Sequence, residues 1–186
     1  MHEFILGGVK SGKSAAAQAR AAAWLCEPGR QATLIATASA GDSEMARRIA
    51  LHRASRAQQL PAMACLELHG AGLVPALLEQ GQADRLLVVD CLTLWLTQML
   101  LPLAGPPASG AEVQGAMAAL TDALLVAPGP VVLVSNEIGL GVTPLGSDTR
   151  RFLDALGQLH QRVASCCQRV TLMVAGCELA VKGPAR

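Results

Sequence analysis

The sequence predicts an α/β fold in which a mainly parallel central sheet carries helices on both faces. Short apolar runs alternate along the chain with longer segments of helical periodicity, a pattern typical of parallel α/β sheets. The runs are continuously apolar, as expected of strands that are buried on both sides. The length of 186 residues is about that of one domain, so we expect residues 1–186 to form a single domain.

The expected strands are short apolar runs bounded by glycine or polar residues. They are Phe4–Leu6, Ala32–Ala36, Arg85–Val89, Val131–Val134 and Val170–Val174. A weaker candidate is Ala64–Glu67. Parallel strands need long connections, and the segments between these runs are long enough to hold helices.

The expected helices fill those connections. An alanine-rich helix should begin near Gly12 and end at Leu25, because alanine favours helix and the following Pro28-Gly29 breaks it. Another follows Gly41-Asp42-Ser43, a third spans Glu112–Leu125, and the last begins at a cap formed by Ser147 or Asp148. The last helix holds Phe152, Leu156, Leu159 and Val163 on one face. The segment Pro102–Gly110 is expected to be a loop.

Composition excludes several classes of protein. Hydrophobic residues make up 52% and charged residues 16%, which excludes a disordered chain. The formal net charge of +1 shows no excess of positive charge of the kind that binds nucleic acid, so we expect no nucleic-acid partner. No apolar stretch is long enough for a membrane span and no signal peptide is recognisable. The 6 cysteines form no C-x-x-C pair, so a reducing cytoplasm is the expected compartment.

The strongest local motif follows the first expected strand. Residues Gly7, Gly8, Val9, Lys10, Ser11, Gly12, Lys13 and Ser14 match the pattern G-x-x-x-x-G-K-[ST] and precede an expected helix. In such a P-loop, backbone amides surround a triphosphate, so we expect Lys13 to reach the β and γ oxygens and Ser14 to bind Mg²⁺. The alternative is a glycine-rich turn that binds no ligand.

A second motif is an apolar strand that ends in a carboxylate. The run Leu86–Val89 leads into Asp90, which is where P-loop proteins place the acid that holds Mg²⁺ directly or through water. We therefore expect Ser14 and Asp90 to form the metal site. Asp90 could instead be a solvated strand end or a helix cap.

A third candidate is His52, which has arginines on both sides. Arg47, Arg48, Arg53 and Arg56 crowd one short segment of a chain that is otherwise poor in charge, and guanidinium groups suit phosphate oxygens. His52 also lies at helical spacing from Met45 and Ile49, so a packed core histidine and a solvated arginine face remain the alternatives.

A fourth candidate is the polar segment that follows the strand Val131–Val134. Ligands bind at the carboxyl ends of strands in open α/β sheets, so Asn136 and Glu137 should face the same crevice as the P-loop. Glu137 is suited to position or deprotonate an acceptor hydroxyl. The alternative is an ordinary turn. We assign no role to His69, Cys166 and Cys167, and expect His160 to be a satisfied surface histidine.

These motifs together resemble the bifunctional adenosylcobinamide kinase/adenosylcobinamide-phosphate guanylyltransferase family of cobalamin biosynthesis. The resemblance covers nearly the whole chain in the right order. It rests on the P-loop, Ile35–Ala38, Glu44–Arg53, Asp90–Leu96, Ser135–Gly139 and Arg150–Phe152. The arginine-flanked histidine and the Asn-Glu-Ile-Gly segment are its most specific parts. The chain departs from the family pattern at Thr143–Gly146 and at His160, where an asparagine is common.

The resemblance implies a RecA-like P-loop fold and two reactions. ATP or GTP would phosphorylate a hydroxyl of adenosylcobinamide, and GMP would then pass from GTP through a guanylyl-histidine to adenosylcobinamide phosphate. The family's guanylylated histidine falls on His52, and its nucleotide contacts fall on the P-loop, Ala36, Thr37, Ala38, Arg53, Ala54, Ser55, Arg56, Glu67 and Asp90. The family also implies a homo-oligomer, with a trimer as one form. The remaining alternatives are a P-loop kinase with one activity and a nucleotide-gated interaction protein.

Overall fold

The computed structural model describes residues 1–38, 47, 50, 58, 60–68 and 72–184. The expected helix that carries Met45, Ile49 and His52 therefore lies largely outside the described residues. The strands are β1 (Glu3–Gly7), β2 (Gln31–Ala36), β3 (Met63–Glu67), β4 (Arg85–Asp90), β5 (Val131–Asn136), β6 (Arg169–Val174) and β7 (Cys177–Lys182). The helices are α1 (Lys13–Leu25), α3 (Leu73–Gln80), α4 (Leu92–Leu100), α5 (Gly110–Val126) and α6 (Ser147–Cys166).

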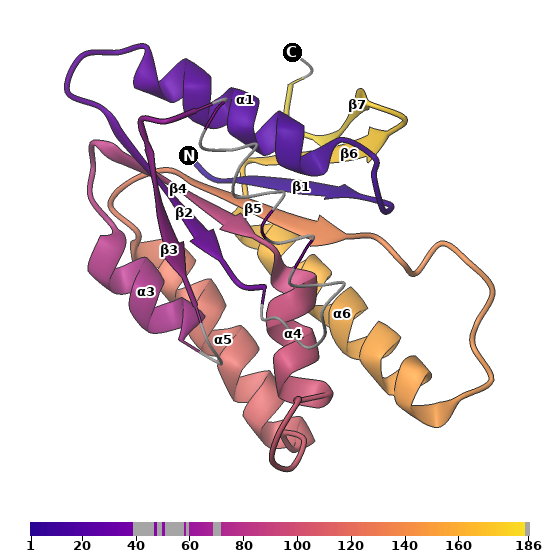
Figure 1. Cartoon of the computed structure of the whole chain (residues 1–186). Coiled ribbons are helices and arrows are strands. Elements are labelled where there is room, and N and C mark those ends of the chain that lie inside the picture. Colours follow the sequence, from indigo (N-terminus) through magenta and orange to yellow (C-terminus); the bar gives the residue numbers. More distant parts are fainter. Residues whose placement is uncertain (39–46, 48–49, 51–57, 59, 69–71, 185–186) are drawn as a thin grey trace.

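The strands form one seven-stranded sheet in the order β3-β2-β4-β5-β1-β6-β7 (Figure 1). Neighbouring strands from β3 to β6 are parallel, and only β7 pairs antiparallel, with β6. Every expected strand is present, including the weaker candidate at β3. Strand β7 was not predicted, because its sequence Cys177–Lys182 mixes charged and apolar residues and all its residues are exposed.

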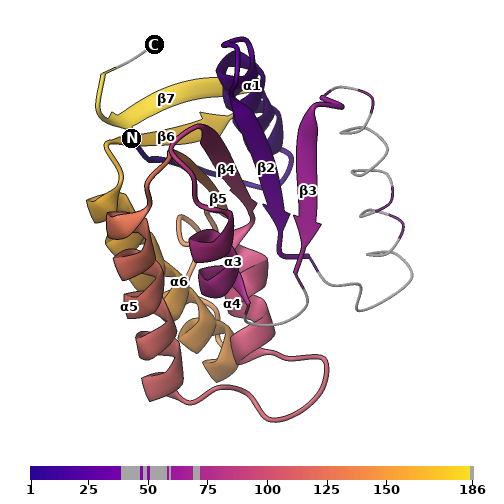
Figure 2. The same ribbon diagram turned by 90° about the vertical axis from the view of Figure 1, so that its left-hand side faces the viewer.

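Helices cover both faces of the sheet, as predicted. Figure 2 shows α1 on one side and α3, α4, α5 and α6 on the other. Consecutive residues of β1 pack on opposite faces of the sheet, because successive side chains of a strand point in opposite directions. Ile5 packs in the cluster beneath α1, whereas Phe4 packs with α4, α5 and α6, and both are 0% exposed. The continuous apolar strands thus reflect burial on two faces.

The expected end of α1 at Leu25 is confirmed, whereas α5 spans Gly110–Val126 and thus begins before the expected Glu112 and ends after the expected Leu125. Helix α5 begins at Gly110, and Ser109 caps it through a reciprocal pair of hydrogen bonds with Glu112. The predicted cap of α6 is wrong, because the helix begins at Ser147 and Gly146 is its N-cap residue. Helices α3 and α4 were not predicted. None of the helices in the described part of the chain is long and apolar enough to cross a membrane.

The parallel strands bring four loop starts to one edge of the sheet. Gly7 at the end of β1 lies opposite Asn136 of β5, and Ala36 at the end of β2 lies opposite Asp90 of β4. The P-loop, Asp90 and the segment after Asn136 therefore emerge side by side. This edge is where we place the candidate active site.

Candidate active site

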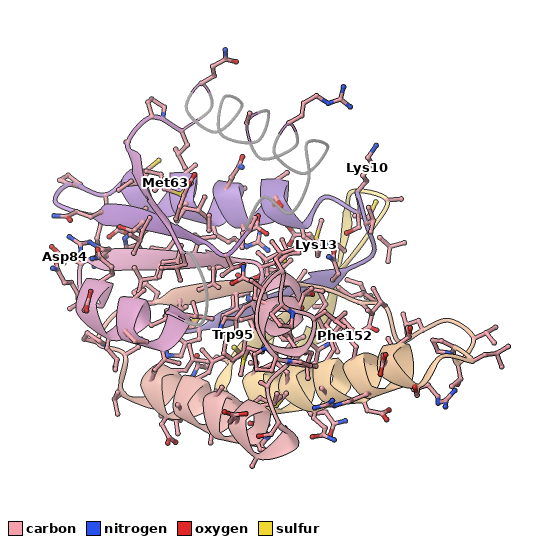
Figure 3. All side chains as sticks on the ribbon, turned by 60° about the horizontal axis from the view of Figure 1, so that its bottom comes forward. Lys10, Lys13, Met63, Asp84, Trp95 and Phe152 are labelled. Carbon is pink, nitrogen blue, oxygen red and sulfur yellow. The ribbon has the colours of Figure 1, made fainter. Side chains whose placement is uncertain are left out.

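The P-loop is a compact turn between β1 and α1 that encloses the Lys13 side chain. The Lys13 ammonium donates to the Gly8 carbonyl at 2.5 Å and lies 3.4 Å from the Ser11 hydroxyl oxygen. Lys13 is only 8% exposed, whereas Lys10 is exposed and projects away from the loop in Figure 3. The sequence motif thus contributes one lysine directed into the loop and one directed outward.

Burial changes the chemistry of Lys13. Loss of water lowers the pKa of its ammonium below the usual value, and the nearby Cys91 and Asp90 oppose that shift. A poorly hydrated cation interacts strongly with phosphate oxygens, because little solvation remains to be displaced when the anion binds. The position and environment of Lys13 suit a contact to a triphosphate.

Two glycines allow the loop to lie against the turn between β6 and β7. A Cβ atom at Gly7 would come within 2.5 Å of both the Met173 carbonyl oxygen and the Ser11 hydroxyl oxygen. At Gly12, φ is +102° and a Cβ atom would lie 3.3 Å from the Gly176 Cα. The Gly176 amide in turn donates to the Ser11 carbonyl at 2.9 Å. The β6–β7 turn therefore supports the P-loop from outside.

Asp90 and Ser14 meet as the two motifs predict. The Ser14 hydroxyl donates to Asp90 Oδ2 at 2.8 Å, although 76 positions separate the residues in the sequence. The residue that caps α4 is Cys91, so Asp90 is not the cap of that helix. A hydroxyl and a carboxylate at this spacing are hard oxygen ligands of the kind that Mg²⁺ prefers, and they fit that ion. No group of three His, Cys, Asp or Glu side chains suited to a metal occurs among the described residues.

Thr37 joins β2 to the residues after β4. Its amide donates to the Asp90 carbonyl at 3.1 Å, and its hydroxyl donates to the Cys91 carbonyl at 2.6 Å and accepts from the Cys91 amide at 2.8 Å. The Gln98 amide group donates to the Thr37 carbonyl at 2.5 Å. Thr37 is 2% exposed, so its amide and hydroxyl hold the backbone of Asp90 and Cys91 in place from within the protein.

Glu137 lies beside the P-loop, as expected for the residue after β5. Its amide donates to the Gly7 carbonyl at 2.9 Å, which ties its backbone to the first residue of the motif. Its side chain accepts a hydrogen bond from the Gly139 amide at 2.6 Å through Oε1, while Oε2 lies 3.4 Å from His160 Nδ1. A carboxylate is therefore held next to the loop that would carry the phosphates.

The expectation that His160 is a surface residue is wrong. His160 is 9% exposed, its Nε2 lies 2.9 Å from the Ser135 hydroxyl oxygen, and its ring meets the edge of Phe4 at 5.4 Å between centroids. Helical spacing carried the missed signal, because position 160 follows the buried Leu156 by four residues. Burial also lowers the pKa of His160, and the Glu137 carboxylate opposes that shift.

The other expected site residues are placed as follows. Ala36 is buried, Ala38 is half-buried, and Glu67 ends β3 opposite Ala36. His52, Arg53, Ala54, Ser55 and Arg56 lie outside the described residues. The geometry therefore brings together the P-loop, Asp90 and Glu137. The role of the segment around His52 rests on the sequence alone.

Comparisons with known proteins agree over almost the whole chain. The profile described as cobinamide kinase / cobinamide phosphate guanyltransferase matches residues 3–181. The bifunctional adenosylcobalamin biosynthesis protein CobP of Pseudomonas aeruginosa is 46% identical over 183 residues, covering 98% of each chain. The bifunctional adenosylcobalamin biosynthesis protein CobU of Salmonella typhimurium is 32% identical, covering 96% of this chain and 98% of that protein.

Solved structures support the fold. The flagellar accessory protein FlaH of Methanocaldococcus jannaschii is similar with a TM-score of 0.54 at 14% identity, covering 98% of this chain and 78% of that one. A KaiC-like protein of Pyrococcus horikoshii has a TM-score of 0.52 at 12% identity, covering 92% and 69%. These structures share the predicted fold, a mainly parallel sheet with helices on both faces, which in this chain carries the P-loop between β1 and α1.

Proposed function

The chain belongs to the cobinamide kinase / cobinamide phosphate guanyltransferase family, and from that premise we propose how its residues divide two reactions between them. It is a bifunctional enzyme of cobalamin biosynthesis that phosphorylates adenosylcobinamide and then transfers GMP to the phosphorylated product. The main supporting observation is the hydrogen bond from the Glu137 amide to the Gly7 carbonyl. This bond holds the residue proposed as the base beside the P-loop proposed to bind the triphosphate.

The first reaction uses the P-loop and Glu137. The P-loop amides and Lys13 bind the triphosphate of ATP or GTP, and the substrate hydroxyl oxygen attacks the γ-phosphorus. The bond from the γ-phosphorus to its bridging oxygen breaks, the nucleoside diphosphate leaves, and the hydroxyl proton passes to the Glu137 carboxylate. Ser14 and Asp90 hold Mg²⁺, which neutralises charge on the phosphates when bound.

The second reaction uses His52 as a covalent nucleophile. A neutral imidazole nitrogen attacks the α-phosphorus of GTP, and pyrophosphate leaves. A phosphate oxygen of adenosylcobinamide phosphate then attacks the same phosphorus, the bond to His52 breaks, and the product carries GDP. Arg53 and Arg56 flank His52 in sequence and suit the charge that develops on the α-phosphate. Further nucleotide contacts come from the residues at Ala36–Ala38, Ala54, Ser55 and Glu67.

We also propose that the enzyme is a cytoplasmic homo-oligomer, with a trimer as one candidate form. Support comes from large apolar side chains that stay exposed in one chain: Leu140 is 82% exposed, and Val142 and Leu145 are each 96% exposed. Exposed apolar groups gathered in one segment are typical of interaction surfaces. The near-neutral net charge is also compatible with a buried interface between subunits. The cytoplasmic location is supported by the 6 cysteines, which form no C-x-x-C pair.

Labelled GTP tests the covalent step. Protein incubated with Mg²⁺ and GTP labelled at the α-phosphate should retain acid-labile, base-stable label after denaturation, and His52→Ala should retain none. His69→Ala is the matched control and should be labelled like the parent. An unlabelled parent that binds GTP normally would overturn the covalent role of His52 and favour a kinase with one activity.

A further inference from the structure

A line of hydrogen-bonded side chains runs behind Glu137 and joins three elements. It begins at Thr93 on α4, passes through Ser135 at the end of β5, and reaches His160 on α6. The Thr93 and Ser135 hydroxyl oxygens lie 2.9 Å apart, and Ser135 lies 2.9 Å from His160 Nε2. These three residues are 7%, 0% and 9% exposed, so their hydrogen bonds are made within the protein.

The direction of each hydrogen bond follows from the two ends of the line. The Asn136 amide donates to the Thr93 hydroxyl oxygen at 2.7 Å. At the other end, a carboxylate can only accept, so His160 presents a proton on Nδ1 to Glu137 Oε2 at 3.4 Å. The neutral ring then accepts at Nε2 from Ser135, and Ser135 accepts from Thr93. Each hydroxyl donates once and accepts once along this line.

The ring of His160 is therefore fixed in one tautomer and one orientation. Phe4 packs against it edge to face, and lowering of the His160 pKa by burial keeps the ring neutral near pH 7. The distance of 3.4 Å to Glu137 is long for a hydrogen bond, but bonds around a catalytic base often tighten when substrate binds. With the Gly139 amide on Oε1, the two carboxylate oxygens are held from two sides.

We propose that His160 is a positioning residue for the kinase reaction, which orients the Glu137 carboxylate toward the acceptor hydroxyl through its Nδ1 proton. This inference rests on the proposed role of Glu137 as general base. It predicts a selective effect, because only the first reaction removes a proton from a hydroxyl. The acceptor of the second reaction is already a phosphate oxygen, and guanylylation of His52 does not use the base.

Two substitutions separate the contacts of the two ring nitrogens. His160→Asn places an amide nitrogen near the Nδ1 position and keeps a donor toward Glu137. His160→Gln reaches the Nε2 position and keeps the partner of Ser135, but it has no donor toward the carboxylate. A residue that served packing alone would give two variants with similar defects in both reactions.

The test measures both reactions on the same enzyme preparations. For His160→Gln we expect kcat of adenosylcobinamide phosphorylation to fall about 10- to 100-fold, as expected of a misplaced catalytic group, with KM within about twofold. For His160→Asn we expect a loss of less than about fivefold. Labelling of the protein by GTP should keep the parent rate in both variants.

Control variants test for general folding defects and for the proposed role of Glu137 as the base. His2→Asn changes another buried histidine, whose ring contacts the Leu124 carbonyl and the Val131 amide, and it should change the two reactions equally or not at all. Ser135→Ala removes the group behind Nε2 and should lower the phosphorylation rate selectively. Equal losses in the Asn and Gln variants, or parallel loss of labelling, would overturn the inference. A Glu137→Gln variant with the parent phosphorylation rate would instead overturn the proposed role of Glu137.

Discussion

The Arg20 guanidinium ties α1, which begins in the P-loop, to β1 and β7, the two strands that flank β6 in the sheet. It forms two hydrogen bonds with Glu3 of β1, at 3.0 and 3.1 Å, and two with Glu178 of β7, at 2.7 and 2.8 Å. The side chains of Arg20 and Glu3 are 6% and 10% exposed, whereas that of Glu178 is 37% exposed. Arg20→Met should therefore leave one buried and one well-hydrated carboxylate.

The expected cost follows from that difference in exposure. Removing one partner of a buried ion pair costs about 3–5 kcal/mol of unfolding free energy, because the remaining charge loses its compensation. The pair with Glu178 contributes less than about 1 kcal/mol, since solvent screens it. Methionine keeps the aliphatic packing of Arg20, so the loss should come mainly from Glu3.

A double-mutant cycle measured by urea unfolding provides the assay. In Arg20→Met/Glu3→Gln the buried charge is gone and the Gln oxygen can still accept from Thr171, which donates to Glu3 at 2.9 Å. We expect the double variant to recover about 2–3 kcal/mol relative to Arg20→Met. Arg30→Met, which breaks an exposed pair with Glu27, should cost less than about 1 kcal/mol. Additive losses, or an Arg20→Met cost as small as that of Arg30→Met, would refute the reasoning.

Further predictions concern the metal ligand, the P-loop and pH. Asp90→Asn should lower phosphorylation and GTP labelling by about 100-fold or more, measured across a Mg²⁺ titration, because Asp90 is a proposed ligand of the Mg²⁺ used in both proposed reactions. Gly7→Ala should cost about 1–3 kcal/mol in urea unfolding, because its Cβ would lie 2.5 Å from the Met173 carbonyl oxygen, whereas Gly8→Ala meets nothing within 4 Å. Burial lowers the His2 pKa from 6.5, so the unfolded chain binds more protons and stability should fall as pH drops below about 6.5. His2→Asn should flatten that slope in unfolding measured against pH, and an unchanged slope would contradict the assignment.

The sequence predicts those parts of the fold and site whose signals are local. The P-loop pattern and the apolar run that ends at Asp90 identify two ends of parallel strands. The Ser14 and Asp90 side chains meet at 2.8 Å because β1 and β4 both flank β5 and α1 packs over β5 and β4. The position of Glu137 beside the P-loop is predicted in the same way, because Glu137 directly follows the parallel strand β5. Strand β7 could not be predicted in this way, since it is exposed and pairs with β6 through a tight turn rather than through an apolar pattern.

His160 shows why a side chain's environment is harder to predict than its element. The last helix was predicted, and the apolar residues on its buried face were identified, yet the histidine on that face was assigned to the surface. A polar residue is stable there only if other elements complete its hydrogen bonds. Ser135 of β5 donates to His160 Nε2, and Ser135 is in turn bonded to Thr93 of α4. Periodicity within α6 indicates that position 160 is buried, but it does not identify those partners.

The same contacts explain how one P-loop edge can serve two chemistries. The proposed phosphate ligand Lys13 and the proposed metal ligands Ser14 and Asp90 lie on the side of α1, whereas Glu137 is contacted by His160 of α6 on the opposite face of the sheet. Altering the line behind Glu137 should therefore change proton transfer without moving the phosphate site. The separate responses of phosphorylation and labelling to His160→Gln measure that independence directly, because in the proposed mechanism both reactions use the P-loop and only phosphorylation uses the Glu137 carboxylate.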